Sequence, residues 1–323
     1  MAWCSVPSHR LRPALAYIGA NLSRPCEPET HDMLTLLFDG IAYGMLLFIL
    51  AVGLSVTMGL MNFINLAHGA FAMVGGYLTV VLMQRWHVPF LWCLPLAFAG
   101  AALLGALLER TLYRHMYRKP HLDQVLFSIG LAFMAVASMD YFMGSQQQIM
   151  QLPEWLRGRT ELWNGSLFEL GMGHYRLFII AVCAALTVGL QFILAKTRFG
   201  SRLRASVDDA RVAAGLGIRV NLVFAATFAV GSGLAGLGGA LGAEVLGLDP
   251  TFPLKFMVYF LIVVAVGGTS SITGPLWAAL LLGIADVAGK YYMPKLGSFI
   301  VYSLMIAILI WRPQGLFVRK GGR

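Results

Sequence analysis

Long apolar stretches separated by short polar loops dominate the sequence. Several of them run for about 20 residues with almost no charge, which is the length of a helix that crosses a bilayer. The pattern predicts an all-α fold, a polytopic membrane bundle of about 8–9 transmembrane helices. The nine stretches lie at about 36–58, 62–83, 89–108, 122–143, 177–195, 220–243, 255–270, 274–289 and 297–311.

The count of eight or nine depends on two short stretches. Residues 255–270 and 274–289 are each shorter than a full crossing and could form a re-entrant pair, which would leave eight crossings. Nine crossings agree better with the positions of the basic residues, because an odd number places the two ends of the chain on opposite sides of the membrane.

Basic residues crowd three alternate loops. Lysine and arginine are retained on the cytoplasmic side of membrane proteins, so these loops are expected in the cytoplasm, with the N-terminus outside and the C-terminus inside. The stretches 145–175 and 244–254 are then external. The three clusters are Arg110, Arg114, Arg118 and Lys119; the loop from Lys196 to Arg219; and Arg312, Arg319, Lys320 and Arg323.

Composition supports the membrane interpretation and limits the alternatives. Hydrophobic residues make up 58% of the chain and charged residues only 12%, whereas soluble domains carry about 25% charged residues. The net charge of +9 comes from the alternate loops and does not require a nucleic-acid partner. The four cysteines contain no CxxC pair, which favours inert thiols over a metal or redox site; they are Cys4, Cys26, Cys93 and Cys183.

Three regions are expected along the chain. Residues 1–32 are rich in proline and arginine and unlike the rest, so we expect an N-terminal extension that is disordered or an incorrectly assigned start before Met33. Residues 33–317 form the transmembrane domain, which includes the cytoplasmic loop 196–219. Residues 318–323 form a basic tail.

The cytoplasmic loop carries a segment, Arg204–Ile218, with the pattern of a short capped helix. Serine is a preferred N-cap and acidic residues favour the first turn, so Ser206 is the expected cap. The helix offers only small apolar groups, which fit a groove on a partner protein better than a bilayer. The residues expected to dock the partner are Arg204, Ser206, Asp208, Asp209, Ala210, Ala213, Gly215 and Gly217.

A polar stripe interrupts the second apolar stretch. Asn62, Asn65 and His68 recur every three residues and Gly69 follows. In an apolar run this pattern predicts a broken or close-packed helix that lines a translocation pathway. The alternative is an interhelical hydrogen-bond network with only a structural role.

Two further patterns concern packing within the membrane. Gly231, Ala235, Gly239 and Ala243 recur every four residues, and this spacing of small residues lets helices approach closely in lipid. Asp286 and Lys290 are four residues apart, which places them on one helix face where they can form an ion pair.

No catalytic motif is present in the sequence. It contains no GxxxxGK[ST] phosphate loop, no HExxH and no GxSG. We therefore expect a protein that is not an enzyme and that uses no metal or other cofactor. An intramembrane enzyme is disfavoured, whereas a stand-alone secondary transporter or channel is a second possible class.

Several ordered motifs resemble one family. The stretches NFINLAHGAF, RASVDDARVAAGLGI, GLAGLGGALGA, VGGTSSITGPLWAALLLG and RPQGLF are similar to those of the membrane subunits of branched-chain amino-acid-type ABC importers. This LivH-type permease family includes urea and amide relatives. The resemblance extends from Met33 to about Phe317, which is nearly the whole chain.

The resemblance implies a function and a set of partners. The chain would be a permease subunit in the bacterial inner membrane that moves branched-chain amino acids by alternating access. Urea, amides or small aromatic acids are the alternative substrates within the family. The implied partners are two ATP-binding subunits, a second permease subunit and a periplasmic binding protein. The segment 204–218 would couple the permease to the ATP-binding subunits.

Overall fold

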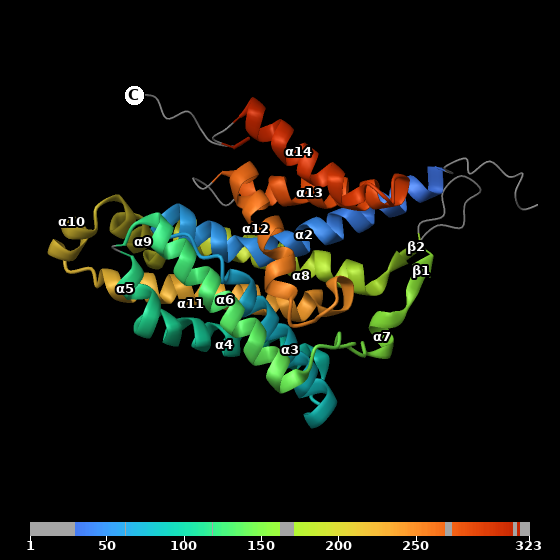
Figure 1. The fold of residues 1–323 in the computed structure, drawn as a ribbon, viewed down its shortest axis with the longest axis horizontal. Coiled ribbons are helices and arrows are strands. Elements are labelled where there is room, and N and C mark those ends of the chain that lie inside the picture. Colours follow the sequence, from blue (N-terminus) through green and yellow to red (C-terminus); the bar gives the residue numbers. More distant parts are fainter. Residues whose placement is uncertain are drawn as a thin grey trace, which may run out of the picture.

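The computed structural model describes residues 30–61, 63–117, 119–161, 171–268, 273–312 and 315–316. Within these residues, nine helices of 15 or more residues form a bundle, which confirms the predicted polytopic fold (Figure 1). Five of the helices are long and apolar enough to cross a membrane. The nine are α2 (Thr30–Met61), α3 (His68–Trp86), α4 (Phe90–Leu108), α6 (His121–Met143), α8 (His174–Lys196), α11 (Val220–Leu246), α12 (Phe252–Gly267), α13 (Thr273–Tyr292) and α14 (Gly297–Trp311).

Short elements connect the long helices. A π-helical turn, η1 (Glu109–Tyr113), continues α4 into α5 (Arg114–Met116), and α9 (Arg198–Asp208) and α10 (Ala210–Gly215) follow α8. The loop after α6 holds α7 (Glu154–Arg157) and an antiparallel ribbon of two strands, β1 (Arg159–Glu161) and β2 (Gly171–Gly173). The apolar pattern did not predict this ribbon, because its two strands are three residues each and lie outside the apolar stretches.

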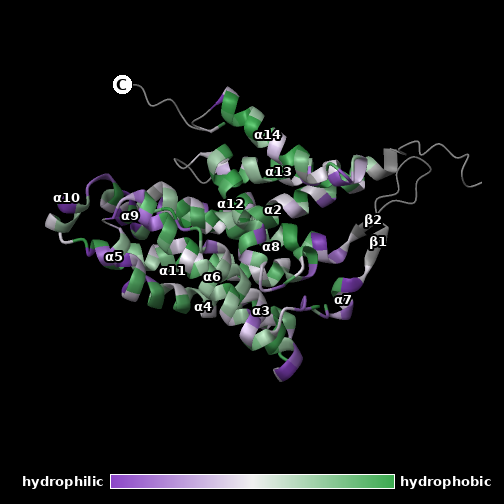
Figure 2. Cartoon of the chain, in the orientation of Figure 1, coloured by the Kyte–Doolittle hydropathy of each residue, from purple (hydrophilic) through white to green (hydrophobic). Residues whose placement is uncertain are grey.

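The two ends of the bundle differ in chemistry. In Figure 1, α5, α9 and α10 gather at one end, whereas α7, the ribbon and the start of α2 lie at the other. Hydrophilic residues concentrate at these ends and at the tip of α3, and hydrophobic residues fill the helices between them (Figure 2). Since basic loops are retained in the cytoplasm, the end that carries α9 and α10 is the expected cytoplasmic end.

Helix α11 lies at the centre of the bundle and is packed through glycines. A Cβ added to Gly231 would lie 3.2 Å from the Cα of Gly53 in α2, and one on Gly239 would overlap the backbone of Ala72 in α3. On a third face, a Cβ on Gly233 would lie 2.8 Å from the ring of Phe98 in α4. Removing side chains at these contacts lets backbones approach closely, which is the main source of helix association in lipid.

The four-residue repeat in α11 lies within this buried region. Gly231 and Gly239 face α2 and α3 as described above, and Ala235 and Ala243 are both buried. A second close contact joins α2 to α13, where a Cβ on Gly40 would lie 2.7 Å from the Cα of Ile284. The small residues of α11 therefore face several neighbours at once.

Ion pairs lie within the helices and between them. Asp286 and Lys290 form the predicted pair on α13, with Nζ and Oδ2 2.5 Å apart, and Asp286 is buried. Asp39 of α2 is paired with Arg176 of α8, a contact between helices far apart in the sequence. Each charge has an opposite partner, as is usual for ionisable residues within transmembrane segments.

Some predictions fall on residues that the structure does not describe. They include most of the N-terminal extension (1–29), the basic tail (318–323), Asn62 and Arg118. Of the four cysteines, Cys93 and Cys183 lie in the described part, where both are buried and form no disulfide.

We expect Gly239→Ala to destabilise the bundle, because the new methyl group would meet the backbone of Ala72, which cannot move aside. Overpacking of this kind costs about 1–3 kcal/mol. The measurement is the midpoint of thermal unfolding of the purified protein in detergent. Gly130→Ala in α6 is the matched control, because nothing lies within 4 Å of the added Cβ. Equal midpoints for the two variants would contradict the close contact.

Candidate functional site: the α9–α10 end

Helix α9 is held against the end of α8. Thr197 caps it, since the Thr197 hydroxyl accepts a hydrogen bond from the Gly200 amide at 3.4 Å. Gly200 is required there because the backbone of Leu194 occupies the position of a side chain. The Arg204 guanidinium also donates to the Leu194 carbonyl. Leu203 is buried, whereas the arginines of α9 are exposed, so this helix presents its basic face outward.

The predicted docking segment is two helices, which corrects the expectation of one. Asp209 adopts an extended backbone (φ −152°, ψ 103°), ends α9 and begins α10. Its carboxylate accepts hydrogen bonds from the amides of Arg211 at 2.8 Å and Val212 at 3.0 Å. An aspartate that bonds nearby amides competes with helix continuation, and this is the physical reason for the break.

The prediction that Ser206 is the N-cap was therefore wrong. Ser206 is buried inside α9 and its hydroxyl donates to the Arg202 carbonyl at 2.8 Å. Asp208 is the last residue of α9 and does not lie in a first turn. Aspartate is an equally good N-cap, and Asp209 takes this position because α9 begins as early as Arg198 and includes Ser206.

The glycines end α10 as their positions indicate. Gly215 is its last residue, and Gly217 has φ +83°, a left-handed conformation that favours glycine. The Ile218 amide donates to the Ala213 carbonyl and the Gly217 amide to the Ala214 carbonyl, both at 3.0 Å. This pair of bonds is the Schellman motif, so α10 is capped at both ends.

Two exposed apolar residues at α10 were not predicted: Val212 lies in the helix and Leu216 directly follows it. Val212 is 59% exposed and Leu216 is 76% exposed. Their spacing of four places them on one side of the helix, and this spacing was the signal that could have identified them. Ala210 and Ala214 are exposed as well, whereas Ala213 is buried against the bundle.

A basic groove adjoins α10. It has a volume of about 920 Å³ and lies between η1–α5, Ala210 of α10 and the start of α11. Three arginines line it: Arg110, Arg114 and Arg219. The Tyr117 hydroxyl donates to the Glu109 carboxylate at 3.2 Å. Burial raises the pKa of Tyr117, and the charge of Glu109 raises it further, so the hydroxyl stays protonated and donates. Because three arginines line it, the groove suits an acidic surface of a partner.

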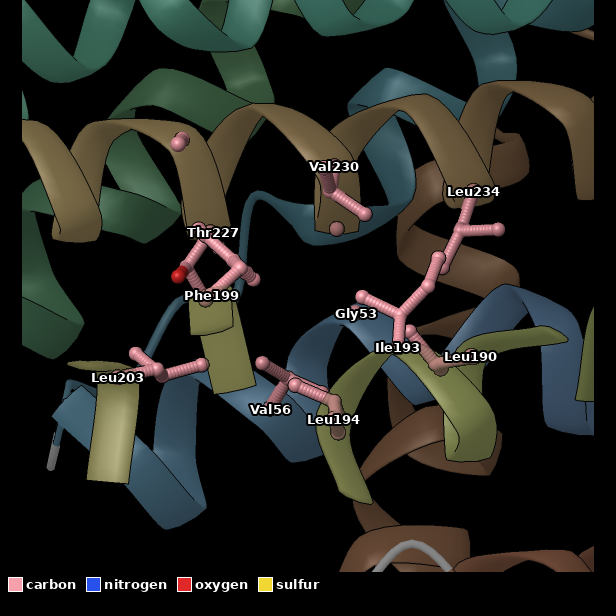
Figure 3. A pocket seen from close by; sticks show the side chains of 12 residues that line it. Gly53, Val56, Leu190, Ile193, Leu194, Phe199, Leu203, Thr227, Val230 and Leu234 are labelled. Carbon is pink, nitrogen blue, oxygen red and sulfur yellow. The ribbon is translucent and has the colours of Figure 1, made fainter. Parts of the chain in front are cut away.

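Behind α9 lies an apolar cavity of about 270 Å³ (Figure 3). Side chains of α2, α8, α9 and α11 point into it, among them Val56, Leu203 and Val230. Its one polar side chain, Thr227, already uses its hydroxyl hydrogen on the Val223 carbonyl at 2.8 Å. On this side α9 therefore has apolar contacts with free space between them, while the Arg204 guanidinium ties it to the Leu194 carbonyl of α8.

The polar stripe lies deep in the bundle at a break between helices. Asn65 is fully buried between α2 and α3, and its Oδ1 accepts from the Tyr113 hydroxyl and from the Ala67 amide, both at 3.1 Å. His68 begins α3, and its Nε2 lies 3.1 Å from the Leu50 carbonyl. The predicted break is present. The Asn65 Oδ1 and the His68 ring have protein partners, whereas the buried Asn65 Nδ2 has no hydrogen-bond partner among the described residues.

The side chains of Asn65 and His68 line neither the basic groove nor the apolar cavity. Asn62 lies outside the described residues. Gly69 is packed against α12, because a Cβ there would lie 2.9 Å from the Cα of Pro253. These contacts agree with the hydrogen-bond network that the sequence analysis left open beside the pathway role.

Residues 36–309 match a family described as the branched-chain amino acid transport system permease component. The chain belongs to this permease family. The match extends from the first turns of α2 into the last turns of α14, so it covers the bundle as a whole.

Individual relatives cover nearly the whole chain. The chain is 25% identical to the high-affinity branched-chain amino acid transport system permease protein BraD of Pseudomonas aeruginosa, over 90% of this chain and 98% of that protein. It is 26% identical to the corresponding protein LivH of Escherichia coli, over 88% and 94%. The E. coli permease LivM is 27% identical, over 84% of this chain and 68% of LivM. No solved structure matches the chain.

We expect Asp209→Ala to loosen α10, because two amides lose their acceptor. Loss of an N-cap costs about 0.5–2 kcal/mol. Hydrogen exchange of the amides of residues 210–216, followed by mass spectrometry, should accelerate. Asp209→Asn is the matched control, since asparagine is an equally good cap. The cap assignment fails if the alanine variant exchanges no faster than the asparagine variant.

Proposed function

We propose that this chain is the permease subunit of an ATP-driven ABC importer that moves branched-chain amino acids across the inner membrane by alternating access. The observation that carries the proposal is the double-capped helix α10, which exposes two apolar side chains beside a basic groove. The BraD and LivH relatives are named as branched-chain amino acid transport permeases, which supports the substrate class.

The exposed face of α10 needs a partner. Val212 and Leu216 lie among basic residues at the expected cytoplasmic end, where burial against another protein is favourable. The sequence has no phosphate loop of its own, so energy would come from separate ATP-binding subunits that dock here. Arg110, Arg114 and Arg219 in the groove would orient them by charge.

Two other partners follow from the family. A second permease subunit would complete the pathway, because the chain presents one α9–α10 segment and the relatives include both LivH and LivM. A periplasmic binding protein would deliver the amino acid at the opposite end, which carries α7 and the ribbon (Figure 1).

The apolar cavity supplies a route for coupling. Movement of the ATP-binding subunits would displace α10, and α9 would follow because they are joined at Asp209. The contacts of Phe199 and Leu203 at the cavity are non-directional, and the Arg204–Leu194 hydrogen bond joins α9 to α8, so the two helices would shift together against α11. Asn65, His68 and Gly69 would hold the nearby helix break in register as the pathway opens.

A stand-alone secondary transporter or channel is the alternative from another class. Such a protein has no use for a capped helix that exposes apolar side chains beside a basic groove. Within the family, urea, amides and small aromatic acids are the alternative substrates, and uptake assays with the isolated binding protein distinguish them.

We expect the double variant Val212→Asp, Leu216→Asp to lose the ATP-binding subunits on co-purification and to abolish uptake, because charge replaces the apolar contact. Insertion into the membrane should be unchanged, since both residues are exposed. The matched control is Ile149→Asp, which is 74% exposed in the loop that follows α6 at the opposite end. Intact co-purification and uptake in the double variant would refute docking at α10. Uptake driven by an ion gradient without ATP-binding subunits would refute the importer proposal as a whole.

A further inference from the structure

Helix α12 begins in the interior of the bundle. Its residue Pro253 packs against Gly69, the second residue of α3. The preceding residue, His68, lies at the level of Gly231 in α11, because a Cβ on Gly53 of α2 would meet both of them. At 1.5 Å per residue, Gly231 lies about 16 Å from the start of α11 and about 22 Å from its end. The first turn of α12 is therefore near the middle depth of the bundle.

The loop before α12 reaches this depth from the outer end. It starts where the Gln148 amide donates to the Leu248 carbonyl at 2.8 Å, beside the segment that leads to α7. Leu248 then packs on Gly76 of α3. Helices α3 and α12 thus both begin inside the bundle and lie side by side. Pairs of discontinuous helices of this kind form the substrate sites of many transporters.

A charged group occupies the start of α12. The Lys255 ammonium is paired with the Asp249 carboxylate. The Thr251 amide donates to the same carboxylate at 2.8 Å, and the Thr251 hydroxyl donates to it as well. The side chain of Lys255 is 57% exposed and that of Asp249 is 16% exposed. The pair is therefore open on one side.

This side of α12 does not suit lipid. Thr251, Lys255 and Val258 are exposed and lie four and three residues apart, so they form one stripe. A lysine at membrane depth costs about 2.5–3.5 kcal/mol on insertion scales, and such residues face water or protein. The stripe therefore fronts an aqueous path or the surface shared with a second permease subunit.

The chemistry of the stripe matches a zwitterion. We infer that Asp249, Thr251 and Lys255 form a transient binding site for the amino acid on its way through the permease. The substrate carboxylate binds Lys255. Its ammonium binds Asp249, and its aliphatic side chain lies toward Val258. A partly exposed ion pair can exchange each partner for the opposite charge of a ligand, whereas urea or an amide carries no charges to exchange.

This inference rests on the proposed function and favours amino acids over the uncharged substrates of the family. It is tested by uptake of a branched-chain amino acid into proteoliposomes that contain the full complex, with its purified binding protein supplied outside. We expect Lys255→Met and Asp249→Asn each to lower uptake by about tenfold or more, the loss of one charge-assisted contact. Lys295→Met, an exposed lysine in the loop between α13 and α14, is the matched control and should transport normally.

A charge-swapped variant separates binding from structure. Asp249→Lys combined with Lys255→Asp can keep the ion pair but reverses its direction at the helix start. We expect uptake to stay low although the complex still assembles with its ATP-binding subunits. Recovery of normal uptake would overturn the site and leave only a structural ion pair. Normal uptake by both single variants would overturn it as well.

The unaltered complex distinguishes the two levels of failure. If it transports branched-chain amino acids but the swapped variant recovers, the site fails while the proposed function stands. If it transports urea instead and the charge variants have no effect, the proposed substrate fails and the site fails with it.

Discussion

The close contact of α11 with three neighbouring helices is the constraint on which the rest of the structure depends. Lipid tails are as apolar as the side chains, so moving a side chain from lipid into a helix contact gains little. Helices in lipid associate where their backbones approach closely and the dispersion attractions of many atom pairs add up. Gly231, Gly233 and Gly239 remove side chains on three faces of α11 and bring α2, α4 and α3 against it. A helix with small residues on one face could pack closely against only one neighbouring helix.

This packing lets polar breaks exist in the bilayer. The residues between α2 and α3 leave the helix, which in hydrocarbon requires that their polar groups find protein partners. The Asn65 Oδ1 and the His68 ring find them on Tyr113 and Leu50 because the surrounding helices are held close, whereas the Asn65 Nδ2 has none among the described residues. The same tight centre supports the start of α12 beside Gly69. The glycine contacts and the hydrogen-bond network together stabilise helix ends at the middle depth of the bundle.

The α9–α10 end follows an opposite principle. Here polar bonds fix each helix locally, through Thr197 at the start of α9 and Asp209 between the two helices. Beside the Arg204–Leu194 hydrogen bond, the contact of α9 with the bundle includes an apolar cavity that is incompletely filled (Figure 3). Helices α9 and α10 are rigid and lie beside a cavity, so they can move as a unit. The glycine-packed centre has no such space and resists movement. The proposed coupling route and the proposed substrate site lie on these two kinds of structure.

The sequence by itself determined the helical bundle, the break after α2, the ion pair of Asp286 with Lys290 and the glycines that end α10. Each depends on apolar length or on contacts within a few residues, which local spacing encodes. It misplaced the cap at Ser206, because two registers satisfy the same local rule and only the extent of α9 selects Asp209. The exposed pair Val212 and Leu216, the interior start of α12 and the open Asp249–Lys255 pair were decided by tertiary structure. They depend on which helix faces are covered by helices that are distant in the sequence, and local sequence patterns do not encode that arrangement.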